Sequence, residues 1–244
     1  MDSNSGFNFN LSEPNPTPVE SGKMSKTFLA SVFSWMFFAL STTGIVAFLF
    51  GHNAALLQML ITNTGMTLLG YIVMFAPIGF VLLMSFGINK LSYPVLLLLF
   101  IAFSILMGMS LSFIFLAYTG ASIASIFFVS AAMFGLMGVV GYTTSTDLTK
   151  FGTLMFMGLI GIIIASVINI FMKSSGMDYI ISFLAVLIFT GLTAYDVQKL
   201  KKIGSTVQNG TDTAAKLAIF GALSLYLDFI NLFLALLRLF GGRK

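Results

Sequence analysis

The sequence predicts an all-α, polytopic membrane protein whose chain crosses the bilayer seven times. Of its 244 residues, 58% are hydrophobic and only 8% are charged, whereas a soluble globular domain carries about 25% charged residues. The apolar residues form continuous runs, and each is close to the length of about 20 residues that a spanning helix needs. A membrane β-barrel would instead show alternating apolar and polar residues. The lipid bilayer is therefore the expected partner of most of the surface.

Seven apolar runs define the expected spanning helices in their order along the chain. They are Thr27–Phe50, Thr67–Ile88, Tyr93–Tyr118, Ser122–Tyr142, Phe151–Phe171, Met177–Val197 and Ala214–Phe240. Turn-forming residues separate most of them, at Gly51-His52-Asn53, Asn89-Lys90, Thr119-Gly120, Ser174-Ser175-Gly176 and Asn209-Gly210. Pro94 fits the first turn of the third helix. Because the connections are short, residues 24–244 are expected to form one transmembrane domain.

The first 23 residues are polar and contain Pro14, Pro16 and Pro18. This composition predicts a disordered tail, because too few apolar side chains are present to offset the entropy of ordering. The tail lacks the basic start and cleavage site of a signal peptide. The first apolar run is therefore expected to remain in the mature protein.

The basic residues that flank the runs predict the orientation of the chain, since cytoplasmic loops carry an excess of lysine and arginine. With the N-terminus inside, the inner side holds Lys23, Lys26, Lys90, Lys150, Lys199, Lys201, Lys202 and Lys216. The outer side holds Lys173, Arg238, Arg243 and Lys244. This distribution predicts a cytoplasmic N-terminus. Seven spans then place the C-terminus outside, unless the last run folds back and leaves it inside.

The reactive side chains exclude several classes of function. The chain has no cysteine and one histidine, His52, so a thiol nucleophile and a structural zinc site lack their ligands. Its 12 lysines and arginines form no basic stripe, which argues against nucleic acid as a partner. We expect no resident cofactor and no enzymatic activity.

Small residues recur at close spacing in the fourth and fifth runs, at Gly135, Gly138, Gly141, Gly158 and Gly161. Glycines on a membrane helix allow a neighbouring backbone to approach closely. The pattern predicts tight packing of these two helices against their neighbours.

Two acidic residues lie within the apolar runs, where a charge costs about 2.5–3.5 kcal/mol on insertion scales. Asp196 is near the predicted cytoplasmic end of the sixth run, and Asp228 is near the middle of the seventh. Asp228 belongs to a polar or small stripe on one helical face, which contains Gly221, Ser224, Asp228, Asn231, Ala235 and Arg238. On the sixth run, Thr193 precedes Asp196 by three residues and is expected to share its face.

No lysine or arginine of the seventh run lies at the depth of Asp228, since Arg238 is about 15 Å further along the axis of that helix. If Asp196 and Asp228 meet, two like charges in a low dielectric resist joint ionisation and share one proton. Such a pair would act as a switch. In the protonated state the switch is closed, and in the ionised state the two carboxylates repel each other and attract cations. The simpler alternative is that each aspartate only satisfies helix ends or hydroxyl groups.

Two motifs carry a resemblance to a known family. They are Thr193-Ala194-Tyr195-Asp196-Val197-Gln198-Lys199 and Ala222-Leu223-Ser224-Leu225-Tyr226-Leu227-Asp228-Phe229-Ile230-Asn231-Leu232-Phe233. Both strongly resemble the Bax inhibitor-1 family, also called the transmembrane Bax inhibitor motif family, in its bacterial inner-membrane branch. The resemblance covers the seven-helix plan and is sharpest between residues 189 and 238.

The resemblance implies a bundle in which six helices surround the seventh, and a calcium leak of the bacterial inner membrane that pH controls. It also implies that Asp196 and Asp228 are the pH-sensing pair. Some family members offer an intramembrane arginine to an ionised aspartate, whereas the first six runs of this chain contain no arginine.

A calcium ion usually takes six to eight oxygen ligands. Asp196 and Asp228, with Asn231, Ser224, Thr193 and water, could form a weak and transient Ca²⁺ site. Weak binding suits conduction, because the ion must also leave. Asn231 could instead make an interhelical hydrogen bond.

Two other functions stay open at this point. Some bacterial relatives resemble regulators of a membrane-bound AAA protease, and the tail Met1–Gly22 could engage such a partner. An intramembrane aspartyl protease would also use two aspartates that share a proton. Its second motif should carry glycine before the aspartate, whereas this chain has Leu227 before Asp228.

Overall fold

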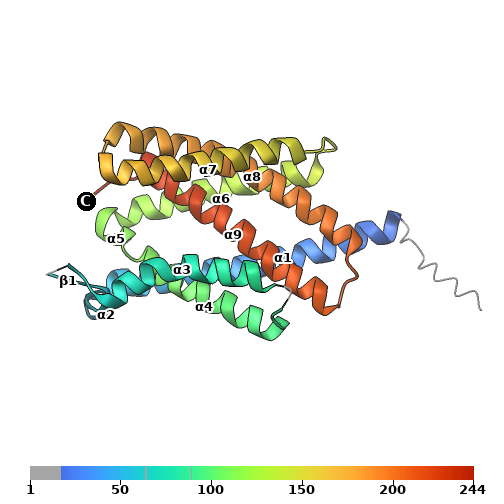
Figure 1. Ribbon diagram of the computed structural model, residues 1–244, viewed down its shortest axis with the longest axis horizontal. Helices are drawn as coiled ribbons and strands as arrows, with labels where there is room; N and C mark the ends of the chain where they lie inside the picture. Colours follow the sequence, from blue (N-terminus) through green and yellow to red (C-terminus); the bar gives the residue numbers. More distant parts are fainter. Residues whose placement is uncertain (1–17, 64, 89) are drawn as a thin grey trace, which may run out of the picture.

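The computed structural model describes residues 18–63, 65–88 and 90–244, and they form a bundle of helices (Figure 1). Within these residues, seven helices are long and apolar enough to cross a membrane, as the sequence predicts. They are α1 (Pro18–His52), α3 (Leu68–Gly87), α4 (Tyr93–Leu111), which continues into α5 (Ile114–Ala117), α6 (Gly120–Thr143), α7 (Thr149–Met172), α8 (Ser175–Thr206) and α9 (Asp212–Phe240).

The connection after α1 has structure that its hydropathy does not predict. It contains a short helix, α2 (Ala54–Leu60), and an antiparallel hairpin of β1 (Ile61–Thr62) and β2 (Gly65–Met66). The Asn53 side chain caps α2 by accepting hydrogen bonds from the backbone N–H groups of Ala55 (3.0 Å) and Leu56 (3.3 Å). Such a cap satisfies donors that have no partner within the helix.

Two helices extend beyond the predicted spans. α1 begins at Pro18, inside the segment predicted to be a disordered tail up to residue 23, while residues 1–17 lie outside the described part. α8 continues to Thr206, nine residues beyond the predicted end at Val197. The two extensions hold each other, because the Ser25 hydroxyl donates to the carbonyl of Lys201 (3.0 Å). The hydropathy of the sequence does not predict hydrogen bonds of this kind between distant segments.

α9 is the central helix of the bundle. In Figure 1 it runs diagonally between one group formed by α6, α7 and α8 and another formed by α1, α3 and α4. It packs against α1, α4, α6 and α8, while α3 packs on α4 and α7 packs on α8. The apolar part of α9 is 67% buried, compared with 56% for α8 and 11% for α7. The predicted central position of the seventh span is confirmed.

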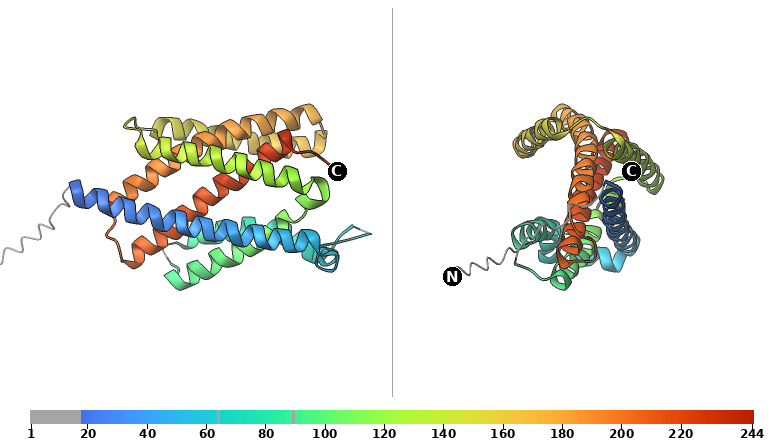
Figure 2. Two further views of the ribbon diagram at one scale, coloured as in Figure 1. Left: turned by 180° about the vertical axis from the view of Figure 1, so that it is seen from behind. Right: turned by 90° about the vertical axis from the view of Figure 1, so that its right-hand side faces the viewer.

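The C-terminus lies at the opposite end of the bundle from the start of α1 (Figures 1 and 2). The backbone N–H of Lys244 donates to the carbonyl of Ala117 (3.1 Å), and that of Thr119 donates to the carbonyl of Gly242 (3.1 Å). These bonds hold the chain end beside α5 and the start of α6. The last helix therefore crosses the bundle fully and does not fold back.

A buried hydrogen-bond chain fixes the rotation of α9. The Thr43 hydroxyl on α1 donates to the carbonyl of Ser104 on α4 (2.8 Å), so it accepts from the hydroxyl of Tyr226 on α9 (2.8 Å). The Tyr226 side chain is fully buried and meets Phe103 edge to face. Because Asp228 is about 200° further round the helix, this anchor turns Asp228 away from α1 and α4.

The close packing that the glycines predict is confirmed at Gly141 and is wrong at Gly135 and Gly161. A Cβ atom at Gly141 would overlap the backbone carbonyl of Ala194 on α8. At Gly135 and Gly161 a Cβ atom would meet nothing within 4 Å. The direct approach of α6 to α8 therefore depends on one glycine rather than on the whole stripe.

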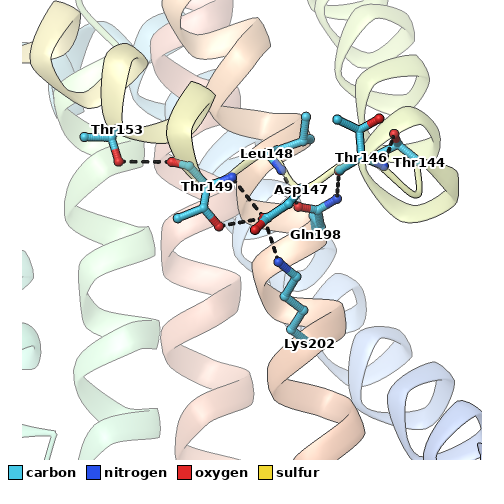
Figure 3. A network of polar contacts seen from close by, with 8 residues as sticks. All are labelled: Thr144, Thr146, Asp147, Leu148, Thr149, Thr153, Gln198 and Lys202. Atoms are coloured by element: carbon cyan, nitrogen blue, oxygen red, sulfur yellow. Dashed lines mark hydrogen bonds and ion pairs between the residues drawn. The ribbon is translucent and has the colours of Figure 1, made fainter.

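The loop between α6 and α7 is held to the end of α8 by Gln198 (Figure 3). Its side-chain amide donates to the carbonyl of Thr146 (2.8 Å) and accepts from the N–H of Leu148 (2.9 Å). Nearby, Lys202 donates to Asp147 (2.8 Å) at an exposed position. This hydrogen bond, with two further ones from Thr149, lowers the pKa of Asp147 to about 2.

The substitution Gly141→Ala should lower the free energy of unfolding by about 1–3 kcal/mol, because the added methyl group overlaps the α8 backbone. Gly135→Ala is the matched control on the same helix. It should be neutral or slightly stabilising, since alanine favours helix and the space is open. Thermal unfolding in detergent micelles measures both, and a larger loss at Gly135 would contradict the assigned packing.

The substitution Gln198→Leu should lower the free energy of unfolding by about 1–3 kcal/mol, because two backbone groups of the loop lose their partners. Lys202→Ala breaks only an exposed ion pair and should change the stability much less. Thermal unfolding again compares the two variants. Equal losses would show that the loop does not depend on the Gln198 amide.

Candidate functional site

A cavity of about 710 Å³ lies inside the bundle between α7, α8 and α9. On α9 it extends from Ser224 to Arg238, a length of about 21 Å at 1.5 Å per residue. The hydrocarbon core of a bilayer is about 30 Å thick. The cavity therefore follows most of the thickness of the hydrocarbon core.

The walls of the cavity differ in polarity. α7 contributes mainly apolar side chains, among them Phe156, Leu159 and Ile162. α7 also contributes Thr153 and Ser166. All the charged lining residues come from α8 and α9, where polar groups follow one another from Lys199 and Asp196 through Ser224, Asp228 and Asn231 to Arg238. Charged and hydrogen-bonding groups thus form a column along one side of an otherwise apolar space.

Asp196 is joined to α9 by a direct hydrogen bond. The Ser224 hydroxyl donates to Oδ2 of Asp196 over 2.8 Å. Asp196 is half-buried and lies three residues before Lys199, at the end of the bundle where α1 begins. The bond holds α8 and α9 together at this end of the cavity.

Asp228 lies one helical turn deeper than Ser224 and is almost fully buried, with 6% of its surface exposed. Its Oδ2 atom has no hydrogen-bond partner among the described residues. A buried polar atom without a partner is costly, so such groups are rare in folded proteins and need an explanation. A proton, a water molecule or a cation in the cavity would satisfy this oxygen.

The structure brings the two predicted aspartates to one place. Both line the same cavity, and Asp228 interacts electrostatically with Asp196. Ser224 links them, because it bonds Asp196 and precedes Asp228 by one turn of α9. The charge pattern of the sequence therefore identifies a real cluster, whose chemistry is that of two carboxylates and a hydroxyl in an apolar surround.

The remaining predicted side chains are placed differently. Asn231 lines the cavity, but its amide donates to the carbonyl of Leu227 on its own helix (2.8 Å) and not across to another helix. Thr193 is fully buried outside the cavity lining and donates to the carbonyl of Phe189 (2.7 Å). Three residues span about 300° of a helix, so Thr193 lies some 60° away from Asp196.

Two cationic side chains close the column at its ends. Lys199 and Arg238 both line the cavity and are exposed. The sequence places Arg238 on the polar stripe and Lys199 among the flanking lysines, yet their common cavity depends on how α8 crosses α9. Lys199 follows Asp196 by three residues, close to one helical turn. This spacing is the signal from which its place in the cavity could have been predicted.

The cluster suits a weak cation site better than a tight one. No three histidine or acidic side chains gather as a metal site in the described part of the chain. A cation beside Asp196 and Asp228 would find two carboxylates, the Ser224 hydroxyl, the oxygen of Asn231 and water. Calcium accepts such oxygen ligands in flexible arrangements.

Comparison with known proteins extends over nearly the whole chain. Residues 25–244 match the family model described as "Inhibitor of apoptosis-promoting Bax1". The inner membrane protein YbhL of Escherichia coli K12 is 46% identical over 220 residues, which cover 90% of this chain and 93% of that protein.

Two uncharacterized proteins extend this likeness to other bacteria. One from Borreliella burgdorferi is 43% identical over 89% of this chain and 92% of its own length. One from Caulobacter vibrioides is 37% identical over 97% of this chain and 98% of its own length. Since the family model spans every helix that carries the site, the chain belongs to the Bax inhibitor-1 family, as its two aspartate motifs indicate.

Proposed function

We propose that the protein is a pH-sensitive calcium leak of the inner membrane, gated by Asp196 and Asp228, which share a proton. One observation carries the proposal: both carboxylates line a cavity that follows most of the membrane depth, and Oδ2 of Asp228 has no hydrogen-bond partner in the described part of the chain. The membrane is inferred from the seven spans and from the name of the relative YbhL.

In the closed state, one proton resides on the aspartate pair. A protonated carboxyl carries no charge, so α8 and α9 remain in contact across the Ser224–Asp196 hydrogen bond. When the proton leaves, two negative charges face each other in a low dielectric. Their repulsion loosens the contact between α8 and α9, and their charge attracts a cation into the cavity.

The charges along the cavity favour slow conduction. A cation must pass Lys199 at one end and Arg238 at the other before or after it meets the aspartates. Positive groups at the mouths of a pore raise the barrier for cations. A small leak is therefore a better match for this column than a highly conductive channel.

The same carboxylates do not match an aspartyl protease as well. Leu227 occupies the position before Asp228 where that chemistry is expected to carry glycine. Leu227 and Asp228 also both line the cavity, so the leucine side chain takes up space beside the carboxyl group. We therefore favour ion movement over peptide hydrolysis.

Calcium flux into proteoliposomes tests the proposal. Wild-type flux should increase as the pH rises, because deprotonation opens the path, and by at most about tenfold per pH unit if a single shared proton controls it. Asp228→Asn and Asp196→Asn imitate the protonated state. Each should give low flux with little pH dependence, measured with a calcium dye inside the vesicles.

Asp147→Asn is the matched control, since this exposed carboxylate has a pKa of about 2 and stays ionised across the tested pH range. It should retain the wild-type flux and pH response. If both cavity variants also retain the wild-type response, the aspartate pair is not the sensor and the proposal fails.

The absence of cysteine in the chain allows a direct test of water in the cavity. Asn231→Cys places a thiol in the cavity, while the adjacent Leu232→Cys places one where the native side chain is fully buried. A water-soluble thiol reagent needs an ionised thiol, so it should modify position 231 faster than position 232. Equal protection of both thiols would mean that water does not enter.

A further inference from the structure

A second, separate groove lies between α1 and α6. It has a volume of about 310 Å³, and its lining includes Lys26, Phe33, Gly135, Val139, Tyr142 and Val197. α1 and α6 both pack on α8, and Val197 of α8 forms the floor of the groove. In Figure 2 the two helices lie on the face seen from behind.

The groove is open to the bilayer and almost entirely apolar. Its rim residue Val139 is 61% exposed and Phe33 is 36% exposed. A Cβ atom at Gly135 would meet nothing within 4 Å, so this glycine keeps the space free without serving helix contact. From Lys26 to Phe33 the groove extends about 10 Å along α1, toward the middle of the membrane.

Positive charge gathers at the end of this groove where Lys26 and Tyr142 lie. Lys26 lines it beside Tyr142, and the Lys201 ammonium donates to the Tyr142 carbonyl (2.7 Å) and lies 4.8 Å from the centre of its ring. Among the described side chains the ion pair joins Lys202 to Asp147, and none of these carboxylates pairs with Lys26 or Lys201. An anionic group fits this end of the groove.

We propose that the groove binds an anionic phospholipid, with one acyl chain between α1 and α6 and the phosphate beside Lys26. Basic residues between membrane helices at the headgroup level are the known chemistry of such sites. A partner helix does not fit, because a cylinder about 10 Å across would need roughly 800 Å³ over the same length.

Native mass spectrometry of the purified full chain in neutral detergent tests the site. Dioleoyl phosphatidylglycerol and dioleoyl phosphatidylcholine differ only in the headgroup, and the wild type should retain the anionic lipid more strongly. Lys26→Gln should weaken its binding about fivefold, which corresponds to about 1 kcal/mol per lysine near a membrane surface. Gly135→Leu fills the groove and should displace both lipids.

Matched controls separate the site from general effects. Gly161→Leu adds the same side chain on the surface of α7, where a Cβ atom also meets nothing within 4 Å. Lys90→Gln removes an exposed lysine that does not line the groove. Both should bind lipid as the wild type does. Equal retention of the two lipids, losses in the controls as large as in the variants, or protein dimers in place of lipid adducts would overturn the proposal.

Discussion

The polar face of α9 cannot be exposed to lipid, and this constraint orders the rest of the bundle. Hydrocarbon offers no hydrogen-bond partners, so Asp228 and Ser224 must face other helices or a water-accessible space. On the opposite side of α9, the hydroxyl chain from Tyr226 to Thr43 and Ser104 holds the helix against α1 and α4. Because both faces are specified, α9 has one rotation in the bundle, and that rotation directs Asp228 toward the cavity shared with α7 and α8.

Hydropathy predicts the seven crossings because a bilayer penalises every unpaired backbone group, which leaves long apolar helices as the solution for this chain. Hydropathy does not predict where the polar ends of the helices lie. α8 continues past Val197 because Gln198 and the Lys201 carbonyl make specific hydrogen bonds with the α6–α7 loop and with α1. These partners lie at least 50 residues away in the sequence, so a local pattern does not reveal them.

The same contrast applies to the site. Asp196 and Asp228 can be found from the sequence because an intramembrane charge is costly and therefore informative. Thr193 precedes Asp196 by three residues but does not line the cavity. It lies about 60° from Asp196 around α8, and this rotation is enough to bury its short side chain between the helices, where it donates to the Phe189 carbonyl. The contribution of α7 is invisible beforehand, because Phe156 and Leu159 look like any lipid-facing residues until α7 is placed opposite α9.

α8 connects the two features proposed to bind ligands. Asp196 lines the cavity, while the next residue, Val197, forms the floor of the groove between α1 and α6. Consecutive residues are about 100° apart on a helix. One turn of α8 therefore directs the Asp196 carboxylate into the cavity and the Val197 side chain into the groove. A shift of α8 that separates Asp196 from Ser224 must also change the shape of the groove. By thermodynamic reciprocity, a lipid that binds the groove differently in the two states then biases the aspartate contact by the same free energy.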